Sequence, residues 1–255
     1  MQKISTICSS FKSQNKIKIL IDSFEKQKYD NKELIIVDGS YEVKDFNSLS
    51  KKFNDKNFVK FYHEPGGSIY ECLNLGITQS TGDIINIMGD DDFFFNNNLF
   101  SEVVNEFNKS IDLFYGDTLY TKNEKFVRYY KSFELKKNLI KISFIPSHTS
   151  SFISKKLYDK IGLYDPSYKI ASDLDFYFRL LNKENLKYVY LNKPISIMSD
   201  GGQSNKSLYN IYNSNLEAIS ILKKNNLNFP FIRVLLKLII KLYLLINFRF
   251  KNEWK

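Results

Sequence analysis

Short apolar runs alternate with amphipathic stretches over the first 115 residues of the chain. Five runs have the length and composition of buried strands, at residues 4–8, 34–37, 59–62, 84–88 and 111–115. Between them, apolar residues recur at helical spacing in four stretches, at residues 17–24, 46–53, 69–77 and 99–107. Regular alternation of strands and helices predicts an α/β fold with a Rossmann-like, mostly parallel sheet flanked by helices.

The pattern changes after about residue 120. Residues 120–133 are rich in aromatic side chains at alternate positions, which predicts a β-hairpin. Further on, residues 157–161 and 174–181 predict helices, and residues 188–191 and 195–198 predict strands. We therefore expect one α/β domain over residues 1–205 and a helical C-terminal region over residues 206–255.

The C-terminal region carries most of the positive charge of the protein. The whole chain has a formal net charge of +9, and residues 223–255 contain eight basic residues against one acidic residue, a net charge of +7. These basic residues are interleaved with long apolar runs. A groove that follows a phosphate backbone is more polar than this, so we do not expect nucleic acid as a partner.

An amphipathic helix is predicted from Pro230 onward, because proline is common at the first helical position. Arg233, Lys237 and Lys241 recur every four residues and form one stripe on an otherwise apolar surface. Each charge costs a few kcal/mol at the centre of a bilayer, which argues against a spanning helix. We expect this tail to lie on the membrane surface, with the stripe among anionic headgroups. A terminal helix packed on the domain or on a second subunit, as in a homodimer, is the alternative.

Cysteine usage and the N-terminal pattern indicate the compartment. Cys8 and Cys72 are far apart and lie in apolar segments, as small core residues of a reducing compartment do. The chain enters a strand pattern directly, without the charged and apolar regions of a secretion signal. We expect a cytoplasmic protein, peripheral on the inner face of the cytoplasmic membrane.

Three adjacent carboxylates follow the predicted strand at residues 84–88. Asp90, Asp91 and Asp92 repel one another unless a cation lies among them. Open α/β sheets bind ligands at the carboxyl ends of their strands. A divalent cation shared with a diphosphate would relieve the repulsion, because such ions take oxygen ligands. A solvated acidic turn is the simpler alternative.

Two further segments lie where the predicted sheet would present ligand-binding groups. Asp38 ends the second predicted strand, where a carboxylate can accept hydrogen bonds from a ribose or a base, although Asp-Gly is also an ordinary turn. The glycine-rich segment 63–76 contains Ser68 and Glu71 at the spacing of a capping box. The backbone at such a helix start can bind phosphate, and a purely structural junction would look the same.

His148 and an acidic segment near residue 173 are the last candidates. His148 is one of two histidines and is a candidate ligand for metal or phosphate, or a satisfied histidine of the core. We expect Ser172 or Asp173 to cap a helix that continues through Arg179. A carboxylate at a helix N-terminus stays ionised and can take a proton from a hydroxyl group; Asp173 and Asp175 are equally explained as capping residues.

The order of these motifs resembles that of family-2 glycosyltransferases with the GT-A fold, particularly the bacterial envelope-polysaccharide branch. The resemblance covers about residues 3–204. The matching segments, in order, are Val37-Asp38-Gly39, Glu64-Pro65 through Asn74 and Gly76, Thr81-Gly82-Asp83, Asp90-Asp91-Asp92, His148, Gly162 through Asp165, Ala171 through Asp175, and Gly201-Gly202-Gln203-Ser204.

This resemblance implies a role for each matching position. Asp173 would be the general base, and Asp92, in the acidic DxD element, would hold Mn²⁺ or Mg²⁺. The donor would be bound by Asp38 at the uridine, by Asp90 or Asp91 near the ribose, by His148 beside the diphosphate, and by Glu64 and Asn74. Some positions depart from the family pattern, including Gly66, Ser68 and Cys72, so the identity of the sugar cannot be transferred.

The implied activity is metal-dependent, inverting transfer of a sugar from a UDP-sugar to a glycan linked to polyprenyl diphosphate, in the synthesis of cell-envelope polysaccharide such as lipopolysaccharide O-antigen. A dehydrogenase is disfavoured because no Gly-x-Gly-x-x-Gly follows the first predicted strand. A non-catalytic nucleotide-binding or scaffold protein on the same fold is the alternative, and a phosphohydrolase that uses the acidic cluster is a third possibility.

Overall fold

The computed structural model of the chain describes residues 1–123, 125–135, 141–143, 145–183, 185–199 and 207–248. Its strands are β1 (Ile4–Ser10), β2 (Lys32–Asp38), β3 (Val59–His63), β4 (Ile84–Met88), β5 (Phe93–Phe94), β6 (Leu113–Lys122), β7 (Lys125–Tyr130), β8 (Ser151–Ser154) and β9 (Tyr188–Ser199). Its helices are α1 (Lys18–Glu25), α2 (Val43–Lys52), α3 (Ile69–Gln79), α4 (Leu99–Phe107), α6 (Lys155–Ile161), α7 (Ser172–Leu181), α8 (Leu208–Lys224) and α9 (Pro230–Phe248), with a 3-10 turn η1 (His148–Ser150).

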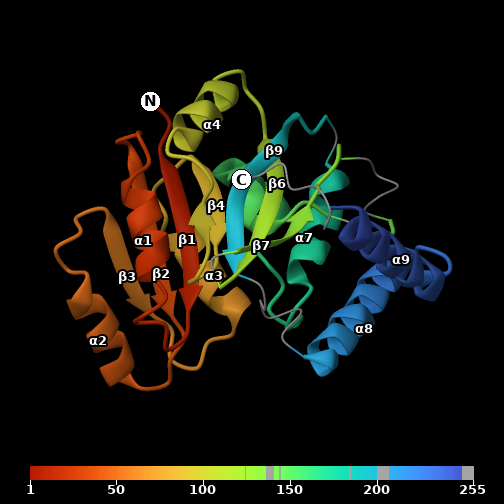
Figure 1. Cartoon of the computed structure of the whole chain (residues 1–255), viewed down its shortest axis with the longest axis horizontal. Coiled ribbons are helices and arrows are strands. Elements are labelled where there is room, and N and C mark those ends of the chain that lie inside the picture. The colour runs from red at the N-terminus through yellow and green to blue at the C-terminus, as the bar shows by residue number, and fades with distance from the viewer. Residues whose placement is uncertain (124, 136–140, 144, 184, 200–206, 249–255) are drawn as a thin grey trace.

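The strands form one mixed sheet in the order β3-β2-β1-β4-β8-β6-β9-β5, and β7 pairs with β6 at its side (Figure 1). β3, β2, β1 and β4 are parallel to one another, so their carboxyl ends share one edge. β8 is antiparallel to both β4 and β6, and β6 is parallel to β9. The predicted α/β sheet flanked by helices is therefore confirmed.

Two apolar clusters fill the space between the sheet and its helices. One contains Leu20 and Phe24 of α1 with Phe100 of α4. The other contains Leu73 of α3, Phe176 of α7 and Leu222 of α8. Because α8 contributes to the same core as α3 and α7, the C-terminal region packs on the α/β domain. The division of the chain at residue 205 stays a prediction.

Local pattern predicted most elements within a few residues. The predicted ranges 84–88 and 99–107 match β4 and α4, and the predicted hairpin is the antiparallel pair of β6 and β7. Two predicted strands, at 188–191 and 195–198, are instead the single strand β9. Pro194 lies where the register between β6 and β9 shifts, and proline is tolerated at such an irregularity. The short strand β8 was not predicted.

Helix α9 lies against β7 and α8 at one side of the molecule (Figure 1). Val234 and Lys237 are buried, with 5% and 7% of their surface exposed, so part of the basic stripe faces the protein. Arg233 Nε donates to the carbonyl oxygen of Asn228 at 2.7 Å. The prediction that the stripe faces lipid headgroups is therefore wrong for Lys237.

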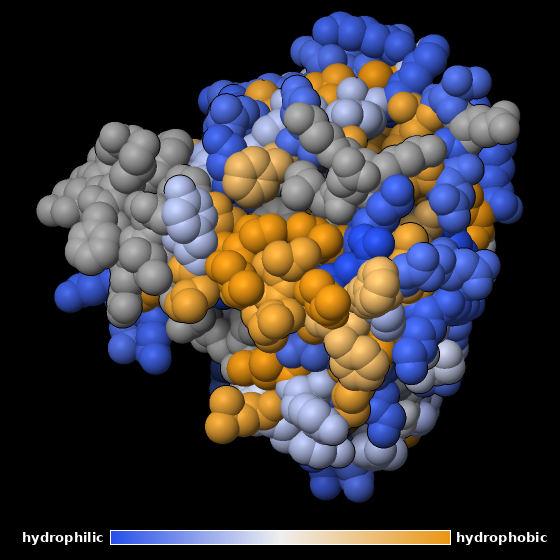
Figure 2. All heavy atoms as spheres, turned by 90° about the vertical axis from the view of Figure 1, so that its right-hand side faces the viewer, coloured by the Kyte–Doolittle hydropathy of each residue, from blue (hydrophilic) through white to orange (hydrophobic). Residues whose placement is uncertain are grey.

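The outward face of α9 is apolar instead. Figure 2 shows a continuous hydrophobic area on this side of the molecule. The large exposed side chains of α9 are Phe231, Ile232, Leu235, Leu236, Leu238, Ile239, Leu242 and Tyr243. No helix in the described part of the chain has the length and hydropathy needed to cross a membrane.

Candidate active site

Asp92 lies just past the carboxyl end of β4 and is almost wholly buried, with 3% of its surface exposed. Its carboxylate accepts hydrogen bonds from the backbone N–H groups of Gly89 at 3.1 Å and Ser199 at 3.2 Å. A Cβ atom at Gly89 would lie 2.6 Å from Asp92 Oδ2, so a side chain at this position would displace the Asp92 carboxylate. Burial, followed by the charge of Asp91, raises the pKa of Asp92 to about 7.

The other two carboxylates of the triplet meet the loop that follows β1. The hydroxyl of Ser13 donates to Asp90 Oδ2, and Lys16 Nζ lies 3.7 Å from Asp91 Oδ2. Burial raises the pKa of Asp90 as well. The Lys16 side chain is 66% exposed, so its stabilising effect is small. A solvated acidic turn does not fit these contacts, because Asp92 is buried without a cationic partner among the described residues.

This acidic end of β4 suits a divalent cation. Carboxylate oxygens are the ligands that Mg²⁺ and Mn²⁺ prefer, and a cation would offset the cost of burying the Asp92 charge. No three or more metal-ligating side chains gather in the described part of the chain. Among the described side chains, Asp92 is the one that would hold a cation at this end of β4.

Asp38 ends β2, on the far side of β1 from the acidic triplet. It is 2% exposed, and Ser40 Oγ donates to Asp38 Oδ1 at 3.0 Å. Burial raises the pKa of its carboxyl group, while the Ser40 hydrogen bond opposes that change. The structure thus places Asp38 and the triplet at one edge of the sheet, as the predicted parallel strands require.

The predicted capping box at the start of α3 is confirmed. Glu71 N donates to Ser68 Oγ at 3.3 Å, and Ser68 N donates to Glu71 Oε2 at 2.8 Å. Glu64 lies beside the end of β2, where its backbone N–H donates to the carbonyl oxygen of Asp38 at 3.0 Å. The start of α3 and Glu64 therefore both border the site. The contact between Glu64 and the donor stays a prediction.

Asn74 on α3 braces the loop before α7. Its side-chain amide donates to the carbonyl oxygen of Tyr164 at 2.8 Å and accepts from Tyr164 N at 3.0 Å. Because both ends of the amide are occupied by one backbone residue, the structure gives Asn74 a positioning contact. The donor-binding role predicted for it is not tested by this contact.

Asp173 lies in the first turn of α7, as predicted, but it does not cap the helix. The N-cap residue is Ala171, without a capping side chain, and Asp173 Oδ1 accepts from the adjacent Leu174 N at 2.8 Å. The predicted capping by Ser172 or Asp173 is therefore wrong. The carboxylate of Asp173 is instead free to face a cavity of about 560 Å³, which it lines with His148.

His148 connects the two acidic parts of the site. It belongs to η1, and its Nδ1 lies 3.9 Å from Asp173 Oδ2. Its electrostatic effect on Asp92 opposes the rise in the pKa of that carboxyl group. The structure thus brings together Asp92, His148 and Asp173, which are 56 and 25 positions apart along the chain.

Glu217 of α8 was missed by the sequence prediction. Its carboxylate accepts the three consecutive backbone N–H groups that precede α7, from Lys169 at 2.8 Å, Ile170 at 2.9 Å and Ala171 at 2.8 Å. The carbonyl oxygen of Ile170 accepts from Tyr70 Oη at 2.6 Å. These bonds fix the backbone that presents Asp173, and no local pattern around Glu217 indicated them.

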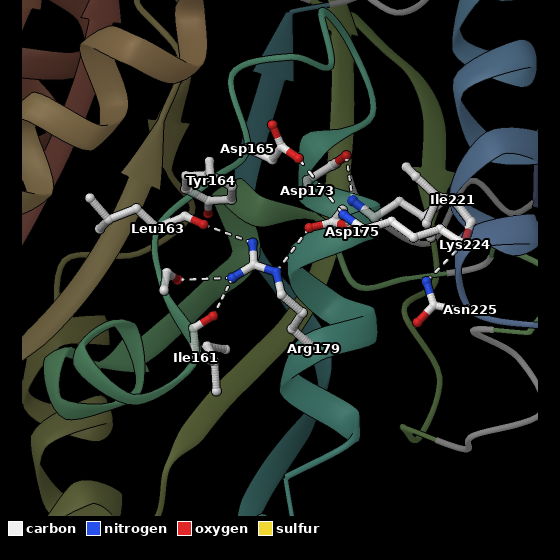
Figure 3. A network of polar contacts seen from close by, with 12 residues as sticks. Ile161, Leu163, Tyr164, Asp165, Asp173, Asp175, Arg179, Ile221, Lys224 and Asn225 are labelled. Atoms are coloured by element: carbon white, nitrogen blue, oxygen red, sulfur yellow. Dashed lines mark hydrogen bonds and ion pairs between the residues drawn. The ribbon is translucent and has the colours of Figure 1, made fainter.

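Asp175 is likewise structural. It is 2% exposed and binds Arg179 Nε at 2.9 Å and Lys224 Nζ at 3.1 Å (Figure 3). Arg179 also donates to the backbone carbonyl oxygens of Ile161, Gly162 and Leu163. This network connects α7 to α8 and to the loop after α6. It therefore holds in place the helix that carries Asp173.

Sequence comparison identifies the family. The model of glycosyl transferase family 2 matches residues 5–172, about two thirds of the chain. The chain belongs to glycosyl transferase family 2. An uncharacterized glycosyltransferase of Rickettsia felis is 26% identical over 70% of this chain and 31% of its own length. A PGL/p-HBAD biosynthesis glycosyltransferase of Mycobacterium tuberculosis is 26% identical over 72% of each chain. The chain thus spans about a third of the Rickettsia felis relative.

Solved structures share the fold. The crystal structure of S. aureus TarS 1–349 in complex with UDP-GlcNAc has a TM-score of 0.66 and 19% identity, over 86% of this chain and 66% of that chain. The mannosyltransferase PcManGT from Pyrobaculum calidifontis, in complex with GDP-Man and Mn²⁺, has a TM-score of 0.62 and 11% identity, over 86% and 64%. At these identities the likeness shows the fold, which is GT-A.

Proposed function

We propose that this family-2 protein is an inverting glycosyltransferase that moves a sugar from a UDP-sugar to a lipid-linked glycan acceptor of the cell envelope. The observation that carries the proposal is the arrangement of Asp92, His148 and Asp173. His148 lies 3.9 Å from Asp173, the carboxylate suited to a base, and acts electrostatically on Asp92, the carboxylate suited to a metal. Membership of glycosyl transferase family 2 supports sugar transfer. The lipid-linked acceptor is part of what we propose.

In this mechanism Asp173 accepts the proton of the acceptor hydroxyl as that hydroxyl attacks the anomeric carbon. The attack and the departure of the nucleoside diphosphate form one displacement, which inverts the anomeric configuration. Asp173 is suited to this role because its side chain is partly exposed, at 27%, and faces the cavity. General base catalysis of this kind contributes about 10²- to 10⁴-fold.

The donor lies across the carboxyl ends of β1, β2 and β4. Asp38 accepts hydrogen bonds from the uridine, while Asp90 and Asp91 lie nearer the ribose. Asp92 would hold a divalent cation, and that cation would supply positive charge to stabilise the departing diphosphate. His148, beside Asp173, orients the diphosphate.

Titration calorimetry of UDP tests the donor site. We expect UDP to bind in the presence of Mn²⁺ and to lose this metal-dependent affinity in Asp92→Ala. Asp83→Ala is the matched control, because Asp83 is an exposed aspartate at the other end of β4. Failure of the wild-type protein to bind UDP with or without Mn²⁺ would reject a UDP-sugar donor.

The apolar face of α9 supports a membrane-bound acceptor. Leu235, Ile239 and Leu242 are 57%, 53% and 59% exposed, beside a C-terminal region with net charge +7. Apolar area and basic charge together bind anionic bilayers. We propose that this face inserts into the surface of the cytoplasmic membrane, at its inner leaflet.

Flotation with vesicles containing anionic lipid tests this surface. Leu235→Glu with Ile239→Glu should abolish co-flotation, whereas Phe126→Glu, at an exposed apolar residue of β7, should leave it intact. Unchanged flotation of the double variant would reject membrane binding through α9. A wild-type dimer that the double variant converts to monomer, without any flotation, would assign the face to a second subunit.

A further inference from the structure

The cavity beside Asp173 has a cationic wall. Lys237 and Lys241 of α9 and Arg128 of β7 line it together with Asp173 and His148. Asp173 is the one carboxylate in its described lining, so the cations outnumber the anions by three to one. Like charges at positions i and i+4 of a helix, such as Lys237 and Lys241, repel each other. The protein therefore holds unbalanced positive charge beside its catalytic base.

Lys237 and Lys241 form no hydrogen bond or ion pair with any residue that the structure describes, whereas the Arg128 guanidinium carbon lies 3.7 Å from the centroid of the Tyr120 ring. Lys237 is 93% buried, and no hydrogen bond or ion pair with a described residue involves its ammonium group. Arg128 Nε and Ser143 Oγ are also buried polar atoms without a hydrogen-bond partner, and both residues line the cavity. A buried charge without a partner is costly, so such groups are typical of ligand sites.

The charge state of Lys237 agrees with this arrangement. Burial lowers the pKa of Lys237 to about 7, the Lys241 charge acts in the same direction, and Asp173 opposes both. The interaction with Asp173 also shows that the lysine and the base are near each other. A bound anion would replace the missing partner and favour the charged form of the lysine.

We propose that Lys237, Lys241 and Arg128 form a subsite for a phosphate group of the acceptor, directly beside Asp173. The inference rests on the proposed glycosyltransfer and narrows its acceptor. Because one cavity holds both the phosphate and the reacting hydroxyl, the phosphate lies close to the sugar that is extended. The acceptor is then an early intermediate, with few sugars between phosphate and hydroxyl.

The exposed face of α9 favours a lipid diphosphate as the source of this phosphate. The same helix presents Lys237 to the cavity and Leu235 and Ile239 to the outside. A prenyl chain in the membrane surface would therefore start next to the cationic wall. A water-soluble sugar phosphate has the same anionic group but gains nothing from the apolar face.

Calorimetric titration with farnesyl diphosphate tests the subsite, with the donor site filled by UDP and Mn²⁺. We expect at least tenfold weaker binding in Lys237→Met and in Arg128→Met. Lys237→Arg should retain most of the affinity, which separates loss of charge from loss of folding. Lys223→Met is the matched control on exposed α8 surface and should bind like the wild type. Equal affinity of wild type and Lys237→Met would overturn the proposal.

Two further titrants distinguish the sources of the phosphate. Tighter binding of farnesyl diphosphate than of inorganic pyrophosphate supports a lipid-linked acceptor, and equal, Lys237-dependent binding of both supports a soluble sugar phosphate. Equal binding of farnesol and farnesyl diphosphate would overturn the anion subsite. Repeating the titrations without UDP separates the two hypotheses: if UDP fails to bind but Lys237-dependent binding persists, the donor assignment fails and the subsite stands.

Discussion

The sheet edge that we propose binds the donor (the donor edge) and the cavity that we propose binds the acceptor (the acceptor cavity) have opposite electrostatic defects. At the donor edge, Asp92 is buried without a cationic partner among the described residues, and burial raises its pKa to about 7. In the cavity, Lys237 is buried without an ion pair to any described residue, and burial lowers its pKa to about 7. Each region places an unbalanced charge where a ligand of opposite sign would bind. His148 and Asp173 line the cavity, and His148 also acts electrostatically on Asp92 at the sheet edge.

Removal of the base should have the largest effect on this arrangement. In Asp173→Asn we expect UDP release in the presence of acceptor to fall about 10²- to 10⁴-fold, because the amide cannot accept the hydroxyl proton. The affinity for UDP and Mn²⁺ should stay at the wild-type value, since Asp92 and Asp38 are unchanged. Steady-state rates together with calorimetry measure both quantities. Wild-type turnover in this variant would reject Asp173 as the base.

The support of Asp173 should have the next largest effect. In Glu217→Gln the amide oxygen can replace Oε2, which accepts from Ile170 N and Ala171 N, but the NH2 group then faces the N–H donor of Lys169, so the backbone before α7 must shift. A displaced catalytic group costs about 10- to 100-fold in kcat. We expect this loss in kcat with unchanged UDP affinity.

The matched control for this positioning role is Glu106→Gln, which removes only a surface ion pair with Lys109. Its kcat should equal that of the wild type. A fall in UDP affinity equal to the fall in kcat of Glu217→Gln would indicate general loss of structure instead of misplacement of Asp173.

These two regions also differ in how far the sequence predicted them. The donor edge depends on parallel strands with local apolar patterns, so Asp38 and the acidic triplet could be placed together in advance. The acceptor side depends on contacts between distant segments. Glu217 reaches residues 169–171 from α8, and β8 is too short to have a pattern of its own.

The periodic spacing of the basic residues in α9 led to a wrong prediction of which face of the helix is exposed. The spacing of Arg233, Lys237 and Lys241 defined a stripe, but it did not say which side of the helix meets the protein. A charged stripe is usually the solvated face, and here Lys237 is buried while Leu235 is exposed. The proposed anion subsite would account for this reversal, because a bound anion would supply the partner that a buried lysine needs.

Acid should weaken the donor side. Because Asp92 must be ionised to hold a cation, and its pKa is raised to about 7, Mn²⁺-dependent UDP binding should weaken as pH falls below 7. The loss should approach about tenfold per pH unit if this one proton controls binding. Calorimetry between pH 8 and pH 5.5 measures the slope, and Mn²⁺-independent binding of UDP serves as the internal control. A flat profile would contradict the assignment of Asp92.

The smallest expected effect is a gain, not a loss, and it concerns the stability of the free protein. A lysine whose folded pKa lies below its unfolded pKa binds protons more tightly in the unfolded chain. Its protonation therefore opposes folding at and below about pH 7, and this cost disappears as pH rises toward the unfolded value near 10.4. Lys237→Met removes the charge and keeps an apolar side chain of similar length. We expect its Tm to exceed that of the wild type by a few °C at pH 7.

The difference in Tm should shrink as pH rises from 7 to 10, and Lys223→Met, on the exposed surface, should show none at any pH. The charged and titratable groups around Lys237 that enter this comparison are Lys241, Arg128, Asp173, His148, Tyr120, Tyr129 and Tyr130. Asp173→Asn in the same series shows how much the carboxylate offsets the lysine, because its loss should lower the pKa of Lys237 further. Lower stability of Lys237→Met at pH 7 would mean that the lysine already has a stabilising partner in the free protein. The contrast with the donor edge would then fail, because only Asp92 would be a buried charge without a partner among the described residues.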